Sequence, residues 1–295
     1  MDYLKKIGVI GCGLMGQGIV KNLLKNKYQV WVFDINEEAM LKLERKGATP
    51  TKTATQLAKE IDCLILSLPS PILIEQLLMN KEDGLLNILP AGTIILDMST
   101  NDVEITQRLY KEADAKQISF FDCPLSGGPA GAEAGTLTII VGGNESDYHN
   151  ILPVLQAVGE NIQYVGPCGA GQTIKLCHNL VVAGVITLLS EALLTGEKAG
   201  IQKKTMAEIF QKGSAQTKVM DVFGSNIINN SFEKINFSLE NMMKDIHLYR
   251  NLAENIQVPT VVSNNIHQIF KITSNKEKDS IDSTAVYKLL KTLGR

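Results

Sequence analysis

A glycine-rich turn near the N-terminus constrains the fold of this 295-residue chain more than any other segment. Gly11, Gly13 and Gly16 directly follow an apolar run at residues 7–10 and precede a segment with helical character. The first glycine permits a tight turn, the second lets the backbone approach a bound group, and the third allows close packing of helix on strand. The sequence therefore predicts a strand, a tight turn and a helix whose N-terminus faces an anion.

Short β-branched runs alternate with helical patterns from residue 7 to about residue 166. That alternation is typical of a parallel sheet wound with helices. We therefore expect an α/β fold with a doubly wound Rossmann domain over residues 1–166. Its predicted strands span residues 7–10, 29–33, 63–68, 93–97, 119–122 and 137–141.

The pattern changes after Gly166 and Pro167, where the β-branched alternation ends. A long helical pattern over residues 171–199 opens a region of helices that reaches Leu293. Residues 205–212 and 284–292 also carry the apolar spacing of packed amphipathic helices. We expect an all-α C-terminal domain over residues 167–295, used for substrate binding and oligomerisation and joined to the first domain by the long interdomain helix.

Composition argues against several classes of partner. The 29 Lys and Arg nearly balance the 31 Asp and Glu, and no run of like charge is long enough to bind nucleic acid. The five cysteines are scattered and lack C-x-x-C spacing, so neither a disulfide framework nor a metal site is expected. The apolar stretch at residues 180–189 is shorter than the roughly 20 residues that span a bilayer. We expect a cytoplasmic protein with no membrane partner, in which this stretch is a buried helix.

Asp34 indicates which ligand the glycine turn binds. It ends the second predicted strand about 20 residues after the glycines, where an acid accepts hydrogen bonds from adenosine ribose hydroxyls. Its charge repels a 2′-phosphate, and no arginine follows at Ile35 or Asn36. The sequence therefore predicts NAD rather than NADP, although an acid here could instead cap the following helix. The predicted cofactor-binding residues of this region are Gly11, Gly13, Leu14, Met15, Gly16 and Asp34.

A second glycine-containing loop follows the predicted strand at residues 119–122. Ser126, Gly127 and Gly128 lie in this loop, at the carboxyl edge where ligands bind in an open α/β sheet. Successive N–H groups in such a turn can hold an anion, and the Ser126 hydroxyl adds a donor. We interpret the loop as the binding site of a substrate carboxylate; the alternative is an ordinary turn.

Lys175 and Asn179 are four residues apart in the long predicted helix and therefore share one face. The neighbouring residues are mostly apolar, which indicates that Lys175 is buried rather than solvated. Desolvation lowers the pKa of a lysine toward the range that suits proton transfer. Asn179 offers both a donor and an acceptor for a substrate oxygen.

Taken together, these segments resemble the β-hydroxyacid dehydrogenase family over the length of the chain. The resemblance rests on IGVIGCGLMGQG, on DCPLSGGPAGAEAGTLTIIVGG, on GAGQTIKLCHN and on Lys244-Asp245 in FSLENMMKDI. It departs from the family pattern at Ser70-Pro71 and in IHLYRNLA after Lys244-Asp245. These departures concern the substrate pocket rather than the chemistry.

The resemblance implies a role for each matching residue. Lys175 is then the general acid/base, and Asn179 orients a substrate whose carboxylate is held by Ser126, Gly127 and Gly128. Lys244 closes over the nicotinamide region. The family's further contacts along the cofactor correspond to the stretch Leu68-Pro69 and to the pair Ser99-Thr100.

The expected activity is NAD-dependent oxidation of a small 3-hydroxy acid, with conversion of 3-hydroxyisobutyrate to methylmalonate semialdehyde as the first hypothesis. One alternative is a reductase of a small aldehyde acid such as tartronate semialdehyde, succinic semialdehyde or glyoxylate; such enzymes more often use NADPH, which Asp34 disfavours. Another is a non-catalytic dinucleotide-binding scaffold, which would be expected to lack Lys175. The long apolar helix also predicts a homodimer or homotetramer.

Overall fold

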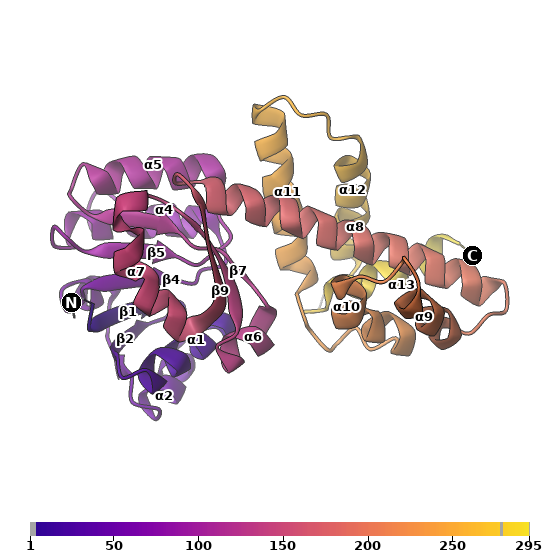
Figure 1. Ribbon diagram of the computed structural model, residues 1–295, viewed down its shortest axis with the longest axis horizontal. Coiled ribbons are helices and arrows are strands. Elements are labelled where there is room, and N and C mark those ends of the chain that lie inside the picture. The colour runs from indigo at the N-terminus through magenta and orange to yellow at the C-terminus, as the bar shows by residue number, and fades with distance from the viewer. Residues whose placement is uncertain (1–3, 278–279, 295) are drawn as a thin grey trace. The chain divides into compact units, whose positions relative to one another are not determined.

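The computed structural model describes residues 4–277 and 280–294 (Figure 1). The chain forms two compact units, Met1–Lys175 and Leu176–Arg295. The division falls within one 29-residue helix, α8 (Ala170–Lys198). The first unit is an α/β domain and the second contains helices, as the sequence predicts.

The first unit is built on one sheet with the order β3-β2-β1-β4-β5-β6-β8-β7, in which β9 also pairs with β8. The pairs from β3 across to β6 are parallel. This is the doubly wound arrangement that the alternation of strands and helices predicts. The strands are β1 (Lys6–Ile10), β2 (Gln29–Phe33), β3 (Thr49–Pro50), β4 (Cys63–Leu66), β5 (Ile94–Asp97), β6 (Ser119–Asp122), β7 (Leu125–Ser126), β8 (Leu137–Gly142) and β9 (Gly159–Gly166).

Three strands were not predicted, and one edge of the sheet is not parallel. β3 and β7 have two residues each, too few to show an alternating pattern. β9 exposes several polar side chains along its length, so it lacks an apolar run. β8 is antiparallel to β6 and β7, which makes the sheet mixed at this side. The strand predicted to reach Leu68 ends at Leu66, so Leu68 and Pro69 lie in a loop.

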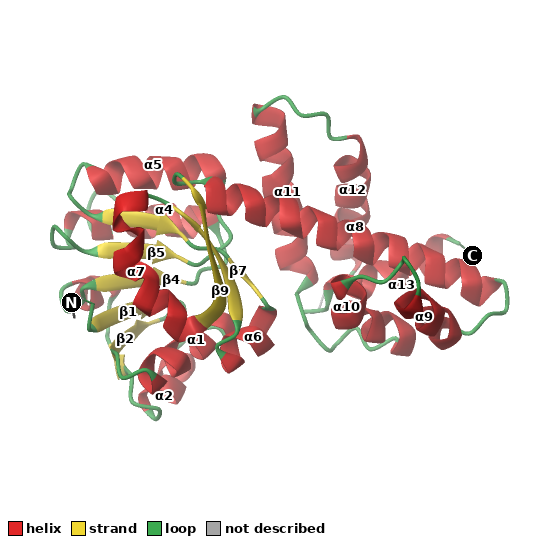
Figure 2. Ribbon diagram, in the orientation of Figure 1, coloured by secondary structure: helices red, strands yellow, loops and turns green. Residues whose placement is uncertain are grey.

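Helices cover both faces of this sheet (Figure 2). On one face α1 packs against α6 and α7, over a core that includes Val9, Ile65 and Leu96. On the other face α4 packs against α5, over a core that includes Leu64, Leu66 and Ile95. The helices are α1 (Leu14–Lys25), α2 (Glu37–Glu44), α3 (Ala54–Ala58), α4 (Pro71–Met79), α5 (Val103–Asp114), α6 (Gly128–Ala134) and α7 (Glu145–Val158), with a 3-10 turn η1 (Leu85–Asn87).

The second unit has its own core, formed by the C-terminal part of α8 and the helices that follow it. These are α9 (Lys203–Lys212), α10 (Lys218–Asn229), α11 (Leu239–Asn255), α12 (Val261–Lys276), η2 (Ser283–Ala285) and α13 (Val286–Leu293). By length and composition α8 is apolar enough to cross a membrane, and 44% of its most apolar window is buried within the protein. The expectation of a buried helix therefore holds for part of α8, whereas Val181 and Leu188 on it are exposed.

Candidate active site

The glycine turn lies between β1 and α1, and each of its glycines has a distinct environment. Gly11 has a φ of +99°, and a Cβ atom there would overlap the Ser67 carbonyl. A Cβ on Gly16 would overlap the Gly11 carbonyl oxygen, so this glycine permits the close packing of α1 on the turn. A Cβ on Gly13 would meet no atom within 4 Å. The space beside Gly13 is thus open to a ligand.

The N-terminus of α1 is suited to a phosphate group. Gly13 is the N-cap residue and provides no side-chain cap, and the first turn contains no acidic residue. The first N–H groups of a helix have no partner within the helix and attract negative charge. Leu14 is exposed and Met15 half-buried at this turn. The residues present therefore fit the pyrophosphate of a dinucleotide.

Asp34 connects the end of β2 to the glycine turn. Its Oδ2 accepts a hydrogen bond from the Cys12 N–H at 2.5 Å, and its Oδ1 accepts one from the Asn36 N–H at 2.8 Å. The N-cap of α2 is Asn36 itself, whose side chain accepts from the Ala39 N–H at 3.1 Å. The alternative in which Asp34 caps this helix is therefore wrong.

Exposed apolar side chains gather at the carboxyl edge of the sheet. Leu14, Ile35 and Ile72 follow the adjacent parallel strands β1, β2 and β4, and all three are exposed, Ile35 by 95%. Single exposed apolar residues are ordinary on protein surfaces. These three side chains lie at the carboxyl edge of the sheet, beside a turn that fits a pyrophosphate. An apolar surface in this position is suited to contact with an adenine ring.

The loops after β4 and β5 are joined by hydrogen bonds at this same edge. The Leu68 N–H donates to Ser99 Oγ at 2.9 Å. The buried carboxylate of Asp97 accepts from the Ser99 N–H at 3.1 Å and from Asn101 Nδ2 at 2.9 Å. These bonds hold the turn that carries half-buried Thr100 beside the segment that carries Leu68 and the exposed Pro69.

Ser126 lies in the short strand β7, where it pairs with Thr138 of β8, rather than in a free loop. Gly127 and Gly128 follow with φ values of +127° and +61°. L-amino acids with side chains rarely adopt these conformations, which explains two successive glycines. The binding of a carboxylate by this turn stays a prediction.

Lys175 and Asn179 are both buried on α8, with exposed fractions of 6% and 4%. Lys175 is the last residue of the first unit, and Asn179 lies one turn further along the helix. Gln172, one turn before Lys175, is fully buried. The spacing of these residues places three buried polar side chains along one stripe of a mostly apolar helix.

In the second unit, Asp245 of α11 contacts two of the predicted site residues. Asn179 Nδ2 donates to Asp245 Oδ2 at 2.6 Å, and Lys244 Nζ lies 3.1 Å from Asp245 Oδ1. Because an ionised carboxylate only accepts hydrogen bonds, it fixes the amide nitrogen of Asn179 toward Asp245. The Asn179 carbonyl oxygen then lies 3.0 Å from His178 Nδ1. The motif contained Asp245, but the sequence alone assigned it no role.

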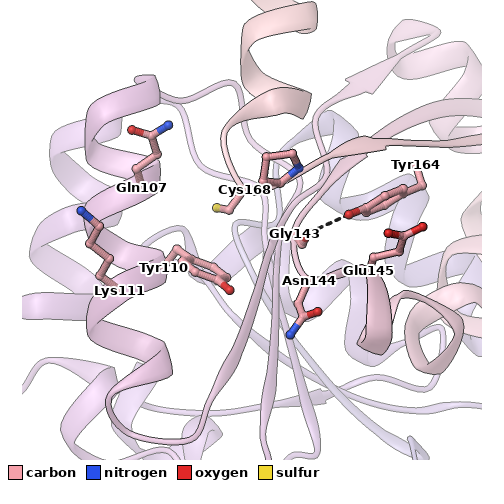
Figure 3. A pocket seen from close by; sticks show the side chains of 9 residues that line it. Gln107, Tyr110, Lys111, Gly143, Asn144, Glu145, Tyr164 and Cys168 are labelled. Carbon is pink, nitrogen blue, oxygen red and sulfur yellow. Dashed lines mark hydrogen bonds between the residues drawn. The ribbon is translucent and has the colours of Figure 1, made fainter.

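A cavity of about 640 Å³ in the first unit contains none of the predicted site residues (Figure 3). Its walls include Tyr110 and Lys111 of α5, Glu145 of α7 and Tyr164 of β9, whose hydroxyl donates to the Gly143 carbonyl at 3.0 Å. Among residues 4–277 and 280–294, no three His, Cys, Asp or Glu side chains come together to hold a metal ion. The motifs, rather than this cavity, define the candidate site.

Comparisons with known proteins agree with the motifs across both units. Residues 6–166 match a model described as the NAD binding domain of 6-phosphogluconate dehydrogenase. Residues 169–290 match a model described as the NAD-binding region of NADP-dependent 3-hydroxyisobutyrate dehydrogenase. Together the two models span most of the chain.

Similar proteins cover nearly the whole chain. A 2-(hydroxymethyl)glutarate dehydrogenase of Eubacterium barkeri is 36% identical over 92% of this chain and 90% of its own length. A probable mitochondrial 3-hydroxyisobutyrate dehydrogenase of Dictyostelium discoideum is 33% identical over 97% of this chain and 91% of its own. A solved structure of the 3-hydroxyisobutyrate dehydrogenase of Mycobacterium tuberculosis with L-serine is 27% identical, with a TM-score of 0.87, over 97% of this chain and 99% of its own. The chain therefore belongs to the β-hydroxyacid dehydrogenase family, whose members are NAD(P)-dependent hydroxyacid dehydrogenases.

Proposed function

We propose that this protein oxidises 3-hydroxyisobutyrate to methylmalonate semialdehyde with NAD. The observation that carries the proposal is the buried position of Lys175 on α8, one turn before buried Asn179, within the motif GAGQTIKLCHN. A buried lysine amine is the kind of group that accepts or donates a proton near neutral pH.

The names of the similar proteins point to one chemical pattern among substrates. The molecules named are 3-hydroxyisobutyrate, 2-(hydroxymethyl)glutarate and L-serine. In each of them one carbon bears both a carboxylate and a CH₂OH group, and they differ in the third substituent, which is methyl, carboxyethyl or amino. The proposed site needs to recognise a carboxylate and a primary hydroxyl, and the third substituent determines specificity.

Each candidate residue has a proposed task in oxidation. The N–H groups and hydroxyl of Ser126, Gly127 and Gly128 bind the substrate carboxylate, and Asn179 orients the substrate through its amide. Neutral Lys175 accepts the hydroxyl proton at Nζ; in reduction the protonated lysine returns it. When bound, the nicotinamide of the cofactor accepts the hydride.

The proposed preference for NAD rests on Asp34. The two family models that match carry NAD and NADP in their descriptions, so family membership leaves the choice open. The Asp34 carboxylate is held against the glycine turn by the Cys12 N–H. A 2′-phosphate at this position would meet a like charge with no arginine at the two following residues.

The proposal is tested by initial rates on 3-hydroxyisobutyrate, 2-(hydroxymethyl)glutarate and L-serine with NAD and with NADP. We expect the highest kcat/KM for 3-hydroxyisobutyrate with NAD. The methyl ester of 3-hydroxyisobutyrate is the matched control; it lacks the carboxylate charge, so its kcat/KM should be lower by roughly one to two decades. A higher kcat/KM for another acid would overturn the substrate assignment. Equal turnover of acid and ester would overturn the carboxylate site.

A further inference from the structure

The first turn of α8 is attached to the loop after β5 by the side chain of Gln172. Its Nε2 donates to the Ser99 carbonyl at 2.9 Å, and its Oε1 accepts from the Asn101 N–H at 3.0 Å. A carbonyl accepts only and an N–H donates only, so these partners fix the orientation of the Gln172 amide. Gln172 and Asn101 are both fully buried.

The same turn is attached to the end of β6 by Asp122, which is also fully buried. Asp122 Oδ1 accepts from the Gly169 N–H and Oδ2 from the Gln172 N–H, each at 2.8 Å. A Cβ on Gly171 would come within 2.7 Å of Asp122 Oδ2, so a glycine is needed for this approach. The carboxylate thereby satisfies N–H groups that would lack a partner at the start of the helix.

These contacts join three strand ends to the turn that precedes Lys175. The loop after β4 is bonded to Ser99 through the Leu68 N–H, the loop after β5 is bonded to Gln172, and β6 ends in Asp122. Lys175 lies three residues after Gln172, on the same face of the helix. Because the intervening turn is helical, fixing Gln172 also fixes the backbone of Lys175 relative to the loops that carry Leu68 and Thr100.

Helix stability alone does not account for this arrangement. A 29-residue helix buries ample apolar surface without a side-chain bond at its third residue. A fully buried amide with one hydrogen bond at its oxygen and one at its nitrogen specifies one arrangement of the groups it joins, whereas an apolar side chain would allow several. Here the groups joined are the loops that we propose to contact the cofactor and the helix that carries the proposed proton-transferring lysine.

We infer that Gln172 and Asp122 are positioning residues for proton transfer by Lys175: they hold the first turn of α8 against the loops after β5 and β6. This inference rests on the proposed function. We do not assign either residue a contact with the reacting atoms; both act through the placement of Lys175. A displacement of about 1 Å at a reacting group can lower a rate by roughly a hundredfold.

The test replaces Gln172 by an apolar side chain of similar length, Gln172→Met, which removes both of its side-chain hydrogen bonds. We expect kcat to fall roughly 10- to 100-fold, with a smaller change in KM. The solvent deuterium isotope effect on kcat should rise, because proton transfer becomes more rate-limiting. The matched control is Thr187→Val, which removes a buried hydrogen bond further along the same helix, to the Ala183 carbonyl, and should leave kcat unchanged.

A double variant separates positioning from a merely structural role. If Gln172 acts through Lys175, Gln172→Met should lower kcat no further in a Lys175→Ala background. The inference would be overturned if the losses of kcat in the two single variants multiplied in the double variant. It would also be overturned if Gln172→Met, per folded molecule, kept both the kcat and the isotope effect of the unmodified protein. Gln172→Glu, which keeps the length and an acceptor for the Asn101 N–H, provides the same measurements if the methionine variant does not fold. We expect Asp122→Asn, like Gln172→Met, to lower kcat and to lower it no further in a Lys175→Ala background.

Failure of the inference and failure of the proposed function give different results. If only the inference fails, Lys175→Ala loses activity while Gln172→Met retains it. If the proposed function fails, the unmodified protein does not oxidise the three hydroxy acids, or Lys175→Ala retains its rate.

Discussion

The carboxyl group of Asp122 is subject to two opposing effects. Its burial raises the pKa from 3.8 to about 6, although hydrogen bonds from the Gly169 and Gln172 N–H groups lower it. Because the pKa in the folded protein lies above that in the unfolded chain, the folded state binds the proton more tightly. The stabilisation from this group is fully present below about pH 4 and is lost as the pH rises through about 6.

This effect predicts how Asp122→Asn changes stability with pH. Asparagine does not titrate, so the free energy of unfolding of the unmodified protein minus that of the variant should fall by up to about 3 kcal/mol between pH 4 and pH 7. Urea unfolding of both proteins at several pH values measures the difference. A difference that does not change with pH would show that the fold does not shift this pKa.

Asp34 predicts the cofactor preference and how to reverse it. Asp34→Ser together with Ile35→Arg should narrow or invert the ratio of kcat/KM for NAD to that for NADP, because the arginine can pair with a 2′-phosphate. Ile35 is the better position for the arginine, since Asn36 caps α2 and its loss typically costs about 1 kcal/mol. Ile35→Arg alone is the control. Comparable kcat/KM for both cofactors in the unmodified protein would refute the assignment.

The turn between β1 and α1 contains two glycines, Gly13 and Gly16, for which we expect opposite effects of substitution by alanine. In Gly16→Ala the new methyl group meets the Gly11 carbonyl oxygen, so α1 must shift and the melting temperature should fall. In Gly13→Ala the methyl group meets no protein atom, so the melting temperature should change little. NADH affinity should nevertheless fall in Gly13→Ala, because the methyl group occupies the space proposed for the pyrophosphate. Unchanged NADH affinity in that variant would place the cofactor elsewhere.

The strand and helix patterns predict long, regular elements well and short or polar ones poorly. The apolar runs of β1, β2 and β6 and the long pattern of α8 gave bounds within one or two residues. β7 and β9 lacked such a signal: one has two residues and the other exposes polar side chains.

The candidate site could likewise be predicted only in part from the sequence. Motif residues such as Lys175 and Ser126 can be found from local sequence, because the motif is local. The hydrogen bonds that Asp122 and Gln172 make, and the bond from Asn179 to Asp245, join residues that are 47 to 73 positions apart along the chain. The periodicity of apolar residues is a local pattern and cannot predict hydrogen bonds between residues so far apart in the sequence. The three-residue spacing of Gln172 and Lys175 is nevertheless present in the sequence. It predicts that Gln172 lies on the same helix face as Lys175 and Asn179.

The second unit exposes apolar side chains that a self-associating protein would bury. Val181 and Leu188 lie seven residues apart on α8 and are 63% and 69% exposed, and Val261 and Val262 begin α12 with similar exposure. We propose a homodimer or homotetramer that covers this surface.

Sedimentation at micromolar concentration should show an oligomer. Val181→Lys with Leu188→Lys should shift the protein toward monomer, whereas Leu41→Lys, at an exposed position on α2, should not. A monomer in the unmodified protein would refute the proposal.

We propose that Lys175 transfers the proton in the oxidation of a hydroxy acid. The most direct test of this proposal is kcat for Lys175→Ala, measured on folded protein together with NADH affinity by fluorescence. A general acid/base typically contributes about 10²- to 10⁴-fold, so kcat should fall at least about a hundredfold. NADH affinity should stay nearly unchanged, because we propose that the glycine turn and Asp34, rather than Lys175, hold the dinucleotide. Retention of more than about a tenth of the unmodified kcat would exclude Lys175 as the group that transfers the proton.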